Sequence, residues 1–340
     1  MIDLAEIEAA RQRIAGAAVR TPLVRLHVQD APAQIYLKLE NLQPINSFKI
    51  RGATNAILLA SAEQRAGGLV TASAGNMAQG VAWAARELGL PATIVVPEHA
   101  PEAKISAIER LGGKVVKLPY DDWWQVIVTG RVDGLTGGSG GSSPRASTAG
   151  GSADFRGANP GALFVHPVQD EGVMAGNGTI GLEILEDLPD PDAVVIPYGG
   201  GGLTVGVASA IKALSPATQI ITAEPATAAA LAAAMQAGHP ADVSYQASFV
   251  DGSGSRRVLD SMWPRVAPLV DKALAIDVGD VAAAVRTLAE RVRVIAEGAG
   301  ALAPAAALAG LAGRGKVVCV VSGGNIDLGK LADILTGASG

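Results

Sequence analysis

Short runs of apolar residues alternate along this chain with longer segments whose apolar residues recur at helical spacing. The short runs are rich in Val, Ile and Leu and carry few polar residues, which is typical of strands buried on both faces of a sheet. We therefore expect strands at Ile35–Leu39, Ala92–Val96, Lys114–Leu118, Ala193–Ile196, Gln219–Ala223 and Lys316–Val321.

The longer segments between these runs predict helices. They are Ile50–Ser61, Met77–Leu88, Glu102–Leu111, Thr179–Leu185, Leu203–Leu214 and Thr227–Ala237. Strands that alternate with helices indicate an α/β fold with parallel sheets covered on both faces. Such sheets bind ligands at the carboxyl ends of their strands, so turns between a strand and a helix are the first places to search for a site.

One segment departs from this alternation. From Thr136 to Ala162 the chain consists mainly of Gly, Ser, Ala and Pro. Such a stretch has too little apolar surface to offset the entropy cost of ordering, so we expect a flexible loop or linker there. A lid over an active site is the functional alternative.

Composition excludes several classes of protein. The 340 residues are 49% hydrophobic and 17% charged, with a formal net charge of −5, which is a globular profile with no electrostatic footprint for nucleic acid. The N-terminus lacks the apolar core of a signal peptide, and the apolar stretch Ala301–Ala312 is too short to span a bilayer. We expect a cytoplasmic protein.

Cys319 is the one cysteine, which excludes an internal disulfide and favours a buried packing role.

A run of four glycines lies between an expected strand and an expected helix. Gly199, Gly200, Gly201 and Gly202 join Ala193–Tyr198 to the helix that starts near Leu203. Bare backbone N–H groups at a helix N-terminus favour a phosphate group. The spacing matches neither a dinucleotide fingerprint nor a P-loop, so the phosphate belongs to another ligand or the run is an ordinary turn.

Three further motifs contain candidate functional residues. Lys49 lies between Phe48 and Ile50, and an apolar site lowers the pKa of an amine and frees its lone pair. The segment from Ser73 to Asn76 leads into a helix and suits a carboxylate ligand, although a helix cap explains it equally well. Ser322 follows the last apolar strand, where it either binds a ring nitrogen or serves as a turn residue.

An amine together with a phosphate cradle suggests pyridoxal 5′-phosphate, an aldehyde that is bound covalently at one end and ionically at the other. In combination and in this order, the motifs resemble the fold-type II pyridoxal-phosphate enzymes, most closely the threonine/serine dehydratase branch. The matching stretches are Lys38–Pro44, Ser47–Gly52, Ser73–Asn76, Gly199–Leu203 and Ser322–Asn325, with secondary matches at Val165–Pro167, Ala175–Ile180, Ala223–Pro225 and Glu297–Ala301.

The resemblance implies a role for each matching residue. Lys49 would form the Schiff base with the cofactor and then remove the substrate Cα proton. Gly199, Gly200, Gly201, Gly202 and Leu203 would hold the phosphate. Asn76 would bind the ring hydroxyl, Ser322 would face the ring nitrogen, Phe48 would pack on the ring, and Gly252 would lie on its other face. Ser73, Ala74, Gly75 and Asn76 would grip the substrate carboxylate.

The same resemblance implies two parallel-sheet α/β domains and an α,β-elimination. The large cofactor domain would comprise residues 1–70 and 162–340, and the small mobile domain residues 71–161, with the Gly/Ser-rich loop at about 136–162. The enzyme would convert L-threonine, L-serine or a related 3-hydroxy amino acid into a 2-keto acid and ammonia, as a homodimer. An amino-acid racemase of the same fold is the alternative, and a non-catalytic binding protein is another. A β-replacement enzyme fits the Ser73–Met77 loop less well.

Three departures from the family pattern affect this interpretation. Met77 stands where dehydratases usually have histidine, which predicts a preference for a larger or more apolar β-substituent. Ala74 stands where racemases of this fold carry the serine that serves as their second acid/base, which favours a lyase. Glu224 matches a cation ligand of several relatives, but Ala230 occupies the position of its aspartate partner, which makes a metal site doubtful.

Overall fold

The computed structural model describes residues 1–129 and 161–337, and these form two compact units. The larger unit comprises Met1–Asn55 and Val168–Gly340, and the smaller unit comprises Ala56–Pro167. The division therefore falls within helix α2 (Lys49–Leu59) and directly before Val168. The predicted Gly/Ser-rich loop lies, except for residues 161 and 162, outside the described residues.

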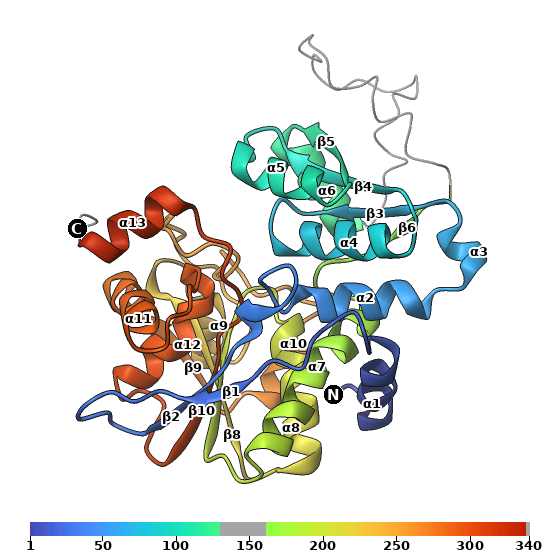
Figure 1. The fold of residues 1–340 in the computed structure, drawn as a ribbon. Helices are drawn as coiled ribbons and strands as arrows, with labels where there is room; N and C mark the ends of the chain where they lie inside the picture. Colours follow the sequence, from blue (N-terminus) through green and yellow to red (C-terminus); the bar gives the residue numbers. More distant parts are fainter. Residues whose placement is uncertain (130–160, 338–340) are drawn as a thin grey trace. The chain divides into compact units, whose positions relative to one another are not determined.

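The described part of the larger unit contains a six-stranded sheet with helices on both faces (Figure 1). The strand order is β1-β2-β10-β7-β8-β9; β1 runs antiparallel to β2, and the other neighbours are parallel. The strands are β1 (Leu23–Arg25), β2 (Gln34–Lys38), β7 (Ala193–Pro197), β8 (Gln219–Pro225), β9 (Lys272–Ile276) and β10 (Lys316–Val320). The α-helices besides α2 are α1 (Leu4–Arg13), α7 (Glu171–Asp187), α8 (Gly202–Leu214), α9 (Ala230–Ala237), α10 (Trp263–Val266), α11 (Val278–Arg291), α12 (Gly298–Leu308) and α13 (Leu328–Thr336).

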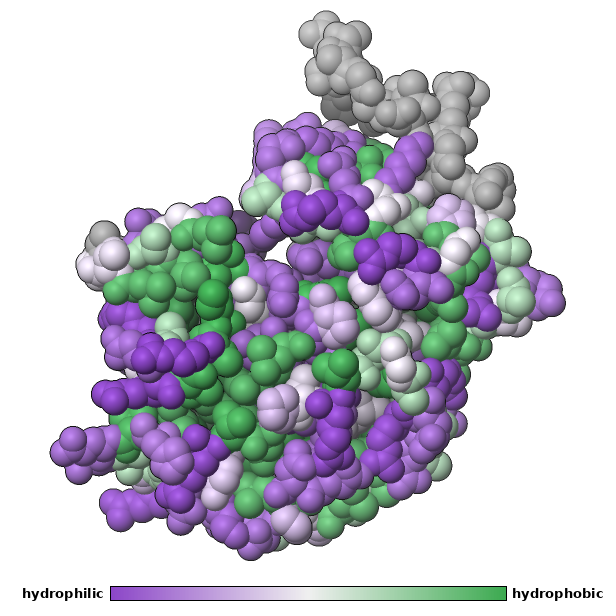
Figure 2. Space-filling model, viewed as in Figure 1, coloured by the Kyte–Doolittle hydropathy of each residue, from purple (hydrophilic) through white to green (hydrophobic). Residues whose placement is uncertain are grey.

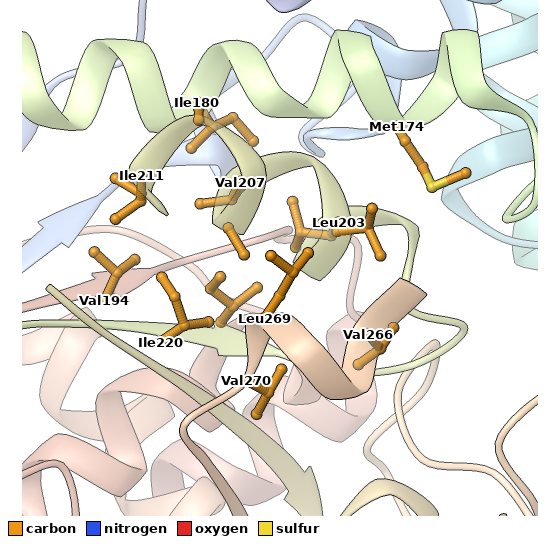
Figure 3. Close-up of a cluster of buried hydrophobic side chains, with 14 of the residues drawn as sticks. Met174, Ile180, Val194, Leu203, Val207, Ile211, Ile220, Val266, Leu269 and Val270 are labelled. Carbon is orange, nitrogen blue, oxygen red and sulfur yellow. The ribbon is translucent and has the colours of Figure 1, made fainter. Parts of the chain in front are cut away.

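Alternate residues of the central strands face two separate apolar clusters. Val194 and Ile196 of β7 pack with side chains from α7, α8 and α10 on one face of the sheet (Figure 3). Ala193 and Val195 pack on the other face with side chains from α11 and α12. This two-sided burial explains why β7, in the middle of the sheet, contains no polar residue. On the face that Figure 2 shows, apolar residues also gather at the surface over α13, where Leu328 and Leu335 are exposed.

The described part of the smaller unit contains a parallel four-stranded sheet in the order β5-β4-β3-β6. Its strands are β3 (Leu69–Ala72), β4 (Ala92–Pro97), β5 (Lys114–Leu118) and β6 (Leu163–Phe164), and its helices are α3 (Ala62–Arg65), α4 (Asn76–Glu87), α5 (Glu102–Arg110) and α6 (Tyr120–Thr129). The predicted α/β class with parallel sheets is confirmed.

Two predicted helices have different bounds in the structure. The helix expected at Thr179–Leu185 runs over Glu171–Asp187, because Asp170 caps it and accepts hydrogen bonds from the N–H groups of Gly172 and Val173. Its many glycines lower the intrinsic helix propensity, so the local pattern underestimates it. The helix expected from Thr227 starts at Ala230, after the short 3-10 turn η4 (Ala226–Ala228).

Candidate active site

The four glycines form the connection between β7 and α8, as the sequence predicts. Gly201 has a φ of 96°, a left-handed conformation that a residue with a Cβ adopts only with strain. A Cβ placed on Gly200 would lie 2.5 Å from Cγ2 of Val168, which is too close for any real contact. The loop therefore requires glycine for both its conformation and its packing, and its N–H groups precede the positive end of α8.

A second loop supports the glycines from the side. The hydroxyl of Ser253 and the N–H of Gly254 both donate to the carbonyl oxygen of Tyr198, the residue before the glycine run. A Cβ on Gly199 would lie 2.6 Å from the carbonyl oxygen of Gly252. Beneath the loop, Val266 of α10 and Leu203 of α8 belong to one buried cluster, in which Figure 3 labels both. The cradle is therefore backed by packed protein.

Lys49 is the first residue of α2 and is partly buried. Its Nζ atom lies 5.1 Å from the centre of the Phe48 ring. Burial lowers the pKa of Lys49 to about 8, although the negative charge of Glu297 acts in the opposite direction. About a tenth of this amine is therefore neutral and nucleophilic at pH 7, a far larger fraction than for an exposed lysine.

The segment that carries Lys49 is tied to the loop after β10. The N–H of Phe48 donates to the carbonyl oxygen of Ser322 at 3.0 Å, and Ser47 forms an antiparallel bridge with Gly323. The N–H of Glu297, which precedes α12, donates to the carbonyl oxygen of Gly323, also at 3.0 Å. The lysine segment and Glu297 are thus both held by backbone hydrogen bonds to the loop that follows the carboxyl end of β10.

A buried nucleophilic amine and a backbone phosphate cradle thus occur in the same unit. The sequence model of the family described as "Pyridoxal-phosphate dependent enzyme" matches residues 14–323. The chain belongs to this pyridoxal-phosphate-dependent enzyme family. The predicted family and cofactor are therefore confirmed.

Individual relatives of this pyridoxal-phosphate enzyme cover almost the whole chain. An L-threonine ammonia-lyase from Thermotoga maritima is 40% identical over 98% of this chain and 78% of its own length. A catabolic L-threonine dehydratase from Staphylococcus aureus is 36% identical over 98% of this chain and 92% of its own length. Maize serine racemase has a TM-score of 0.83 and 32% identity over 99% of this chain and 97% of its own. A threonine deaminase from Solanum lycopersicum has the same score and identity and covers 99% of this chain and 88% of its own.

The residues of this pyridoxal-phosphate enzyme fit its cofactor. The glycine loop offers bare N–H groups at the α8 N-terminus for the dianionic phosphate, and any Cβ at Gly200 would occupy space that Val168 already fills. Lys49 offers an amine of lowered pKa for the aldehyde. Phe48 and Ser322 are both buried beside Lys49 through the bonds described above. The structure therefore brings Phe48, Lys49, Gly199 to Leu203, Gly252 and Ser322 into one unit.

The predicted carboxylate loop belongs to the smaller unit. Ser73, Ala74 and Gly75 connect β3 to α4, and Asn76 is the first residue of that helix. The hydroxyl of Ser73 accepts a hydrogen bond from the N–H of Gly75 at 3.2 Å. This bond forms a turn within the loop, and no side chain among the described residues caps the N-terminus of α4, so the helix-cap alternative is not borne out. The N–H groups that begin α4 are suited to a carboxylate.

Glu224, the one candidate metal ligand, is fully buried on β8. Its Oε1 accepts from the N–H of Leu231 at 3.0 Å and its Oε2 from the N–H of Ala232 at 2.9 Å. Both carboxylate oxygens therefore cap the N-terminus of α9. Among residues 1–129 and 161–337, no three His, Cys, Asp or Glu residues are grouped so that they could hold a metal ion.

Two functional residues were not assigned a role from the sequence. Glu297 lies within one of the matching motifs, but the sequence gives no sign that its charge raises the pKa of Lys49. Val168 was not noted, and only the fold reveals that it packs on Gly200. Cys319 is buried, as expected, and burial raises the pKa of its thiol. None of the helices within the described ranges has the length and apolar character needed to cross a membrane.

Proposed function

We propose that this protein is a pyridoxal-phosphate-dependent ammonia-lyase that converts L-threonine, L-serine or a related 3-hydroxy amino acid into a 2-keto acid and ammonia. The observation that carries the proposal is the buried amine of Lys49 in the same unit as the four-glycine cradle. The similarity to an L-threonine ammonia-lyase and an L-threonine dehydratase over nearly the whole chain supports the choice of reaction.

Each residue has a defined task in this reaction. When bound, pyridoxal phosphate supplies an electron sink for the negative charge that develops at the substrate Cα. Lys49 accepts the Cα proton at Nζ, which its lowered pKa permits near neutral pH. The glycine loop and Leu203 would hold the phosphate through backbone N–H groups, and Ser322 would bind the ring nitrogen. Phe48 and Gly252 would contact the ring.

Substrate binding falls to the loop after β3. Ser73, Ala74, Gly75 and Asn76 would bind the substrate carboxylate, and Asn76 would also bind the ring hydroxyl. The α-proton and the β-hydroxyl leave together as the elements of water. The enamine so released tautomerises and takes up water again, which yields the keto acid and ammonia.

A racemase is the second candidate, because maize serine racemase matches 99% of this chain. Racemisation requires an acid on the face opposite Lys49, and Ala74 has no group that carries a proton. We therefore favour elimination over racemisation.

A panel of amino acids distinguishes these functions. Purified protein supplied with pyridoxal phosphate is incubated with L-threonine, L-serine and bulkier 3-hydroxy amino acids, and keto acid and enantiomers are measured in parallel. Keto acid release that Lys49→Ala abolishes supports the proposal. Formation of D-enantiomer without keto acid would establish the racemase, and neither product from any substrate would indicate a binding protein.

We also propose that the enzyme is a cytoplasmic homodimer. The domain limits expected from the sequence, residues 1–70 with 162–340 and residues 71–161, likewise stay a prediction. Light scattering on the purified full chain tests the dimer, and limited proteolysis tests the limits of the domains.

A further inference from the structure

Arg51 lies two residues after Lys49 in α2 and is 2% exposed. Its guanidinium group donates to both oxygens of Glu40, with both distances 2.8 Å, and to both oxygens of Glu183, at 2.7 and 2.9 Å. It also donates to the hydroxyl of Thr179 at 3.0 Å and to the carbonyl oxygen of Val19 at 3.2 Å. All of the nitrogens of this side chain are therefore held in fixed directions.

The two carboxylates are themselves fixed by other elements. Lys38 of β2, which is fully buried, donates to Glu183 at 2.5 Å and to the carbonyl oxygen of Thr21 at 2.6 Å. The hydroxyl of Thr21 donates to Glu40 at 2.6 Å. Lys38, Glu40, Arg51 and Glu183 thus form a buried network with two charges of each sign. Burial by itself would raise the pKa of Glu40, but the charge and hydrogen bonds of Arg51 lower it below its usual range.

Stability alone does not account for this network. Desolvating four charges costs several kcal/mol per ion, and well-packed apolar side chains of similar volume often stabilise a core as well or better. What apolar side chains cannot supply is direction. The contact of α2 with α7 illustrates the difference, because a Cβ on Gly176 would lie 2.5 Å from the carbonyl oxygen of Arg51. Such glycine contacts permit close approach but do not fix rotation about the helix axis.

Rotation of α2 matters because Lys49 is on the same first turn. Residues two positions apart in a helix differ by about 200° in direction and about 3 Å along the axis. Arg51 and Lys49 therefore point to nearly opposite sides of α2. Phe48 is fixed to Ser322 directly before the helix, and Arg51 is fixed to α7 and to the turn at Glu40 directly after Lys49. Anchoring one side of the turn sets the position of the other.

We propose that Arg51 is a positioning residue for Lys49: its bonds to Glu40 and Glu183 fix the first turn of α2 so that the Lys49 amine reaches the cofactor aldehyde above the glycine cradle. This inference rests on the proposed role of Lys49. It assigns Arg51 no contact with cofactor or substrate. The network sets geometry at Lys49 and leaves the phosphate cradle unaffected.

Two cofactor forms separate the positioning role from a structural one. Pyridoxal 5′-phosphate binds through its phosphate, its ring and the lysine amine, whereas pyridoxine 5′-phosphate keeps the phosphate and the ring but has no aldehyde to react with the amine. The test variant is Arg51→Met/Glu40→Gln, which removes one charge of each sign and leaves the pair of Lys38 and Glu183 intact. Val285→Ala is the buried control, since Val285 is a fully buried side chain of α11 outside the network, and Arg20→Met is the exposed control, since Arg20 pairs with Glu186 and Asp187 at the surface.

The test variant is expected to bind pyridoxal phosphate about 10- to 100-fold more weakly, the range that ångström-scale misplacement of a reacting group produces. Its affinity for pyridoxine phosphate is expected to stay within about twofold of the wild-type value, which is a difference of about 0.4 kcal/mol in binding free energy. Val285→Ala lowers the melting temperature but keeps both affinities. Borohydride trapping of cofactor on Lys49, measured by mass spectrometry, falls only in the Arg51 variants.

Arg51→Lys covers the case in which the double variant does not fold. It keeps the charge but not the planar fork, so we expect a smaller loss in the same direction. Equal losses for both cofactor forms, or equal losses in Val285→Ala, would show that the network is merely structural. Wild-type protein that traps no cofactor on Lys49 would instead overturn the proposed function, and this inference with it.

Discussion

Val168 occupies the space into which a side chain on Gly200 would project, because a Cβ there would lie 2.5 Å from its Cγ2 and 2.8 Å from its Cγ1. Val168 is also the residue at which the chain re-enters the larger unit. The glycine loop proposed to hold the phosphate is therefore shaped by Val168, which lies 32 positions before Gly200 in the sequence.

Gly200→Ala is expected to destabilise the protein by about 1 to 3 kcal/mol through overpacking and to weaken the binding of both pyridoxal and pyridoxine phosphate. Val168→Ala/Gly200→Ala removes the clash and should recover most of the lost stability. Denaturant unfolding and cofactor titration measure the two effects, with Val168→Ala alone as the control. Full cofactor affinity in Gly200→Ala would contradict the assignment of the cradle.

The reactivity of Lys49 in the cofactor-free protein should rise with pH through a midpoint near 8, since burial lowers its pKa to about 8. Glu297→Gln removes the negative charge that opposes this shift, so the midpoint should move to lower pH. The rate at which acetic anhydride labels Lys49, followed by mass spectrometry, gives both midpoints, and the exposed Lys330 in the same digest calibrates the reagent. An unchanged midpoint in Glu297→Gln would show that the two groups do not interact.

Glu224 should make stability depend on pH, because burial raises the pKa of its carboxyl to about 7. The folded state then binds a proton more tightly than the unfolded state, so this carboxyl stabilises the fold below about pH 4.5. That contribution is lost as the pH rises towards 7. As the pH rises through this window, the free energy of unfolding of Glu224→Gln should increase by roughly 3 kcal/mol relative to that of wild type. Urea unfolding of both proteins between pH 5 and 8 gives the slope of the free energy of unfolding against pH. Losing the cap of α9 in Glu224→Gln lowers stability by the same amount at every pH, so it does not change this slope. If the free energy of unfolding changed with pH equally in the two proteins, the pKa of Glu224 would not be raised.

Met77 is the second residue of α4 and is 2% exposed. We expect Met77→His to raise the kcat/KM ratio of L-threonine to a bulkier 3-hydroxy amino acid by about tenfold, because a polar ring replaces adaptable apolar volume. Met77→Leu is the control of similar volume and should keep the wild-type ratio. Identical ratios in all three proteins would remove Met77 from the determinants of specificity.

The sequence predicts those parts of the fold that depend on local pattern. The strand Lys114–Leu118 has the predicted bounds, and β7 extends its prediction only by Pro197. Residues 171–187 form a much longer helix than predicted, since α7 is stabilised by packing against α8 rather than by its own glycine-rich sequence. The strand β9 (Lys272–Ile276) was not predicted, because a lysine and two alanines among its five residues give it a weak strand pattern.

The amino-acid sequence by itself determined the chemical groups of this enzyme: an amine in an apolar setting, four consecutive glycines after a strand, and a serine after the last strand. These motifs could be found because each is contiguous and because its chemistry follows from the residue types. Only the tertiary structure decided which groups act on one another. Glu297 affects Lys49, Val168 shapes the glycine loop and Arg51 holds two carboxylates from distant segments. Charge interactions and close packing act through space, and the order of residues along the chain does not specify them.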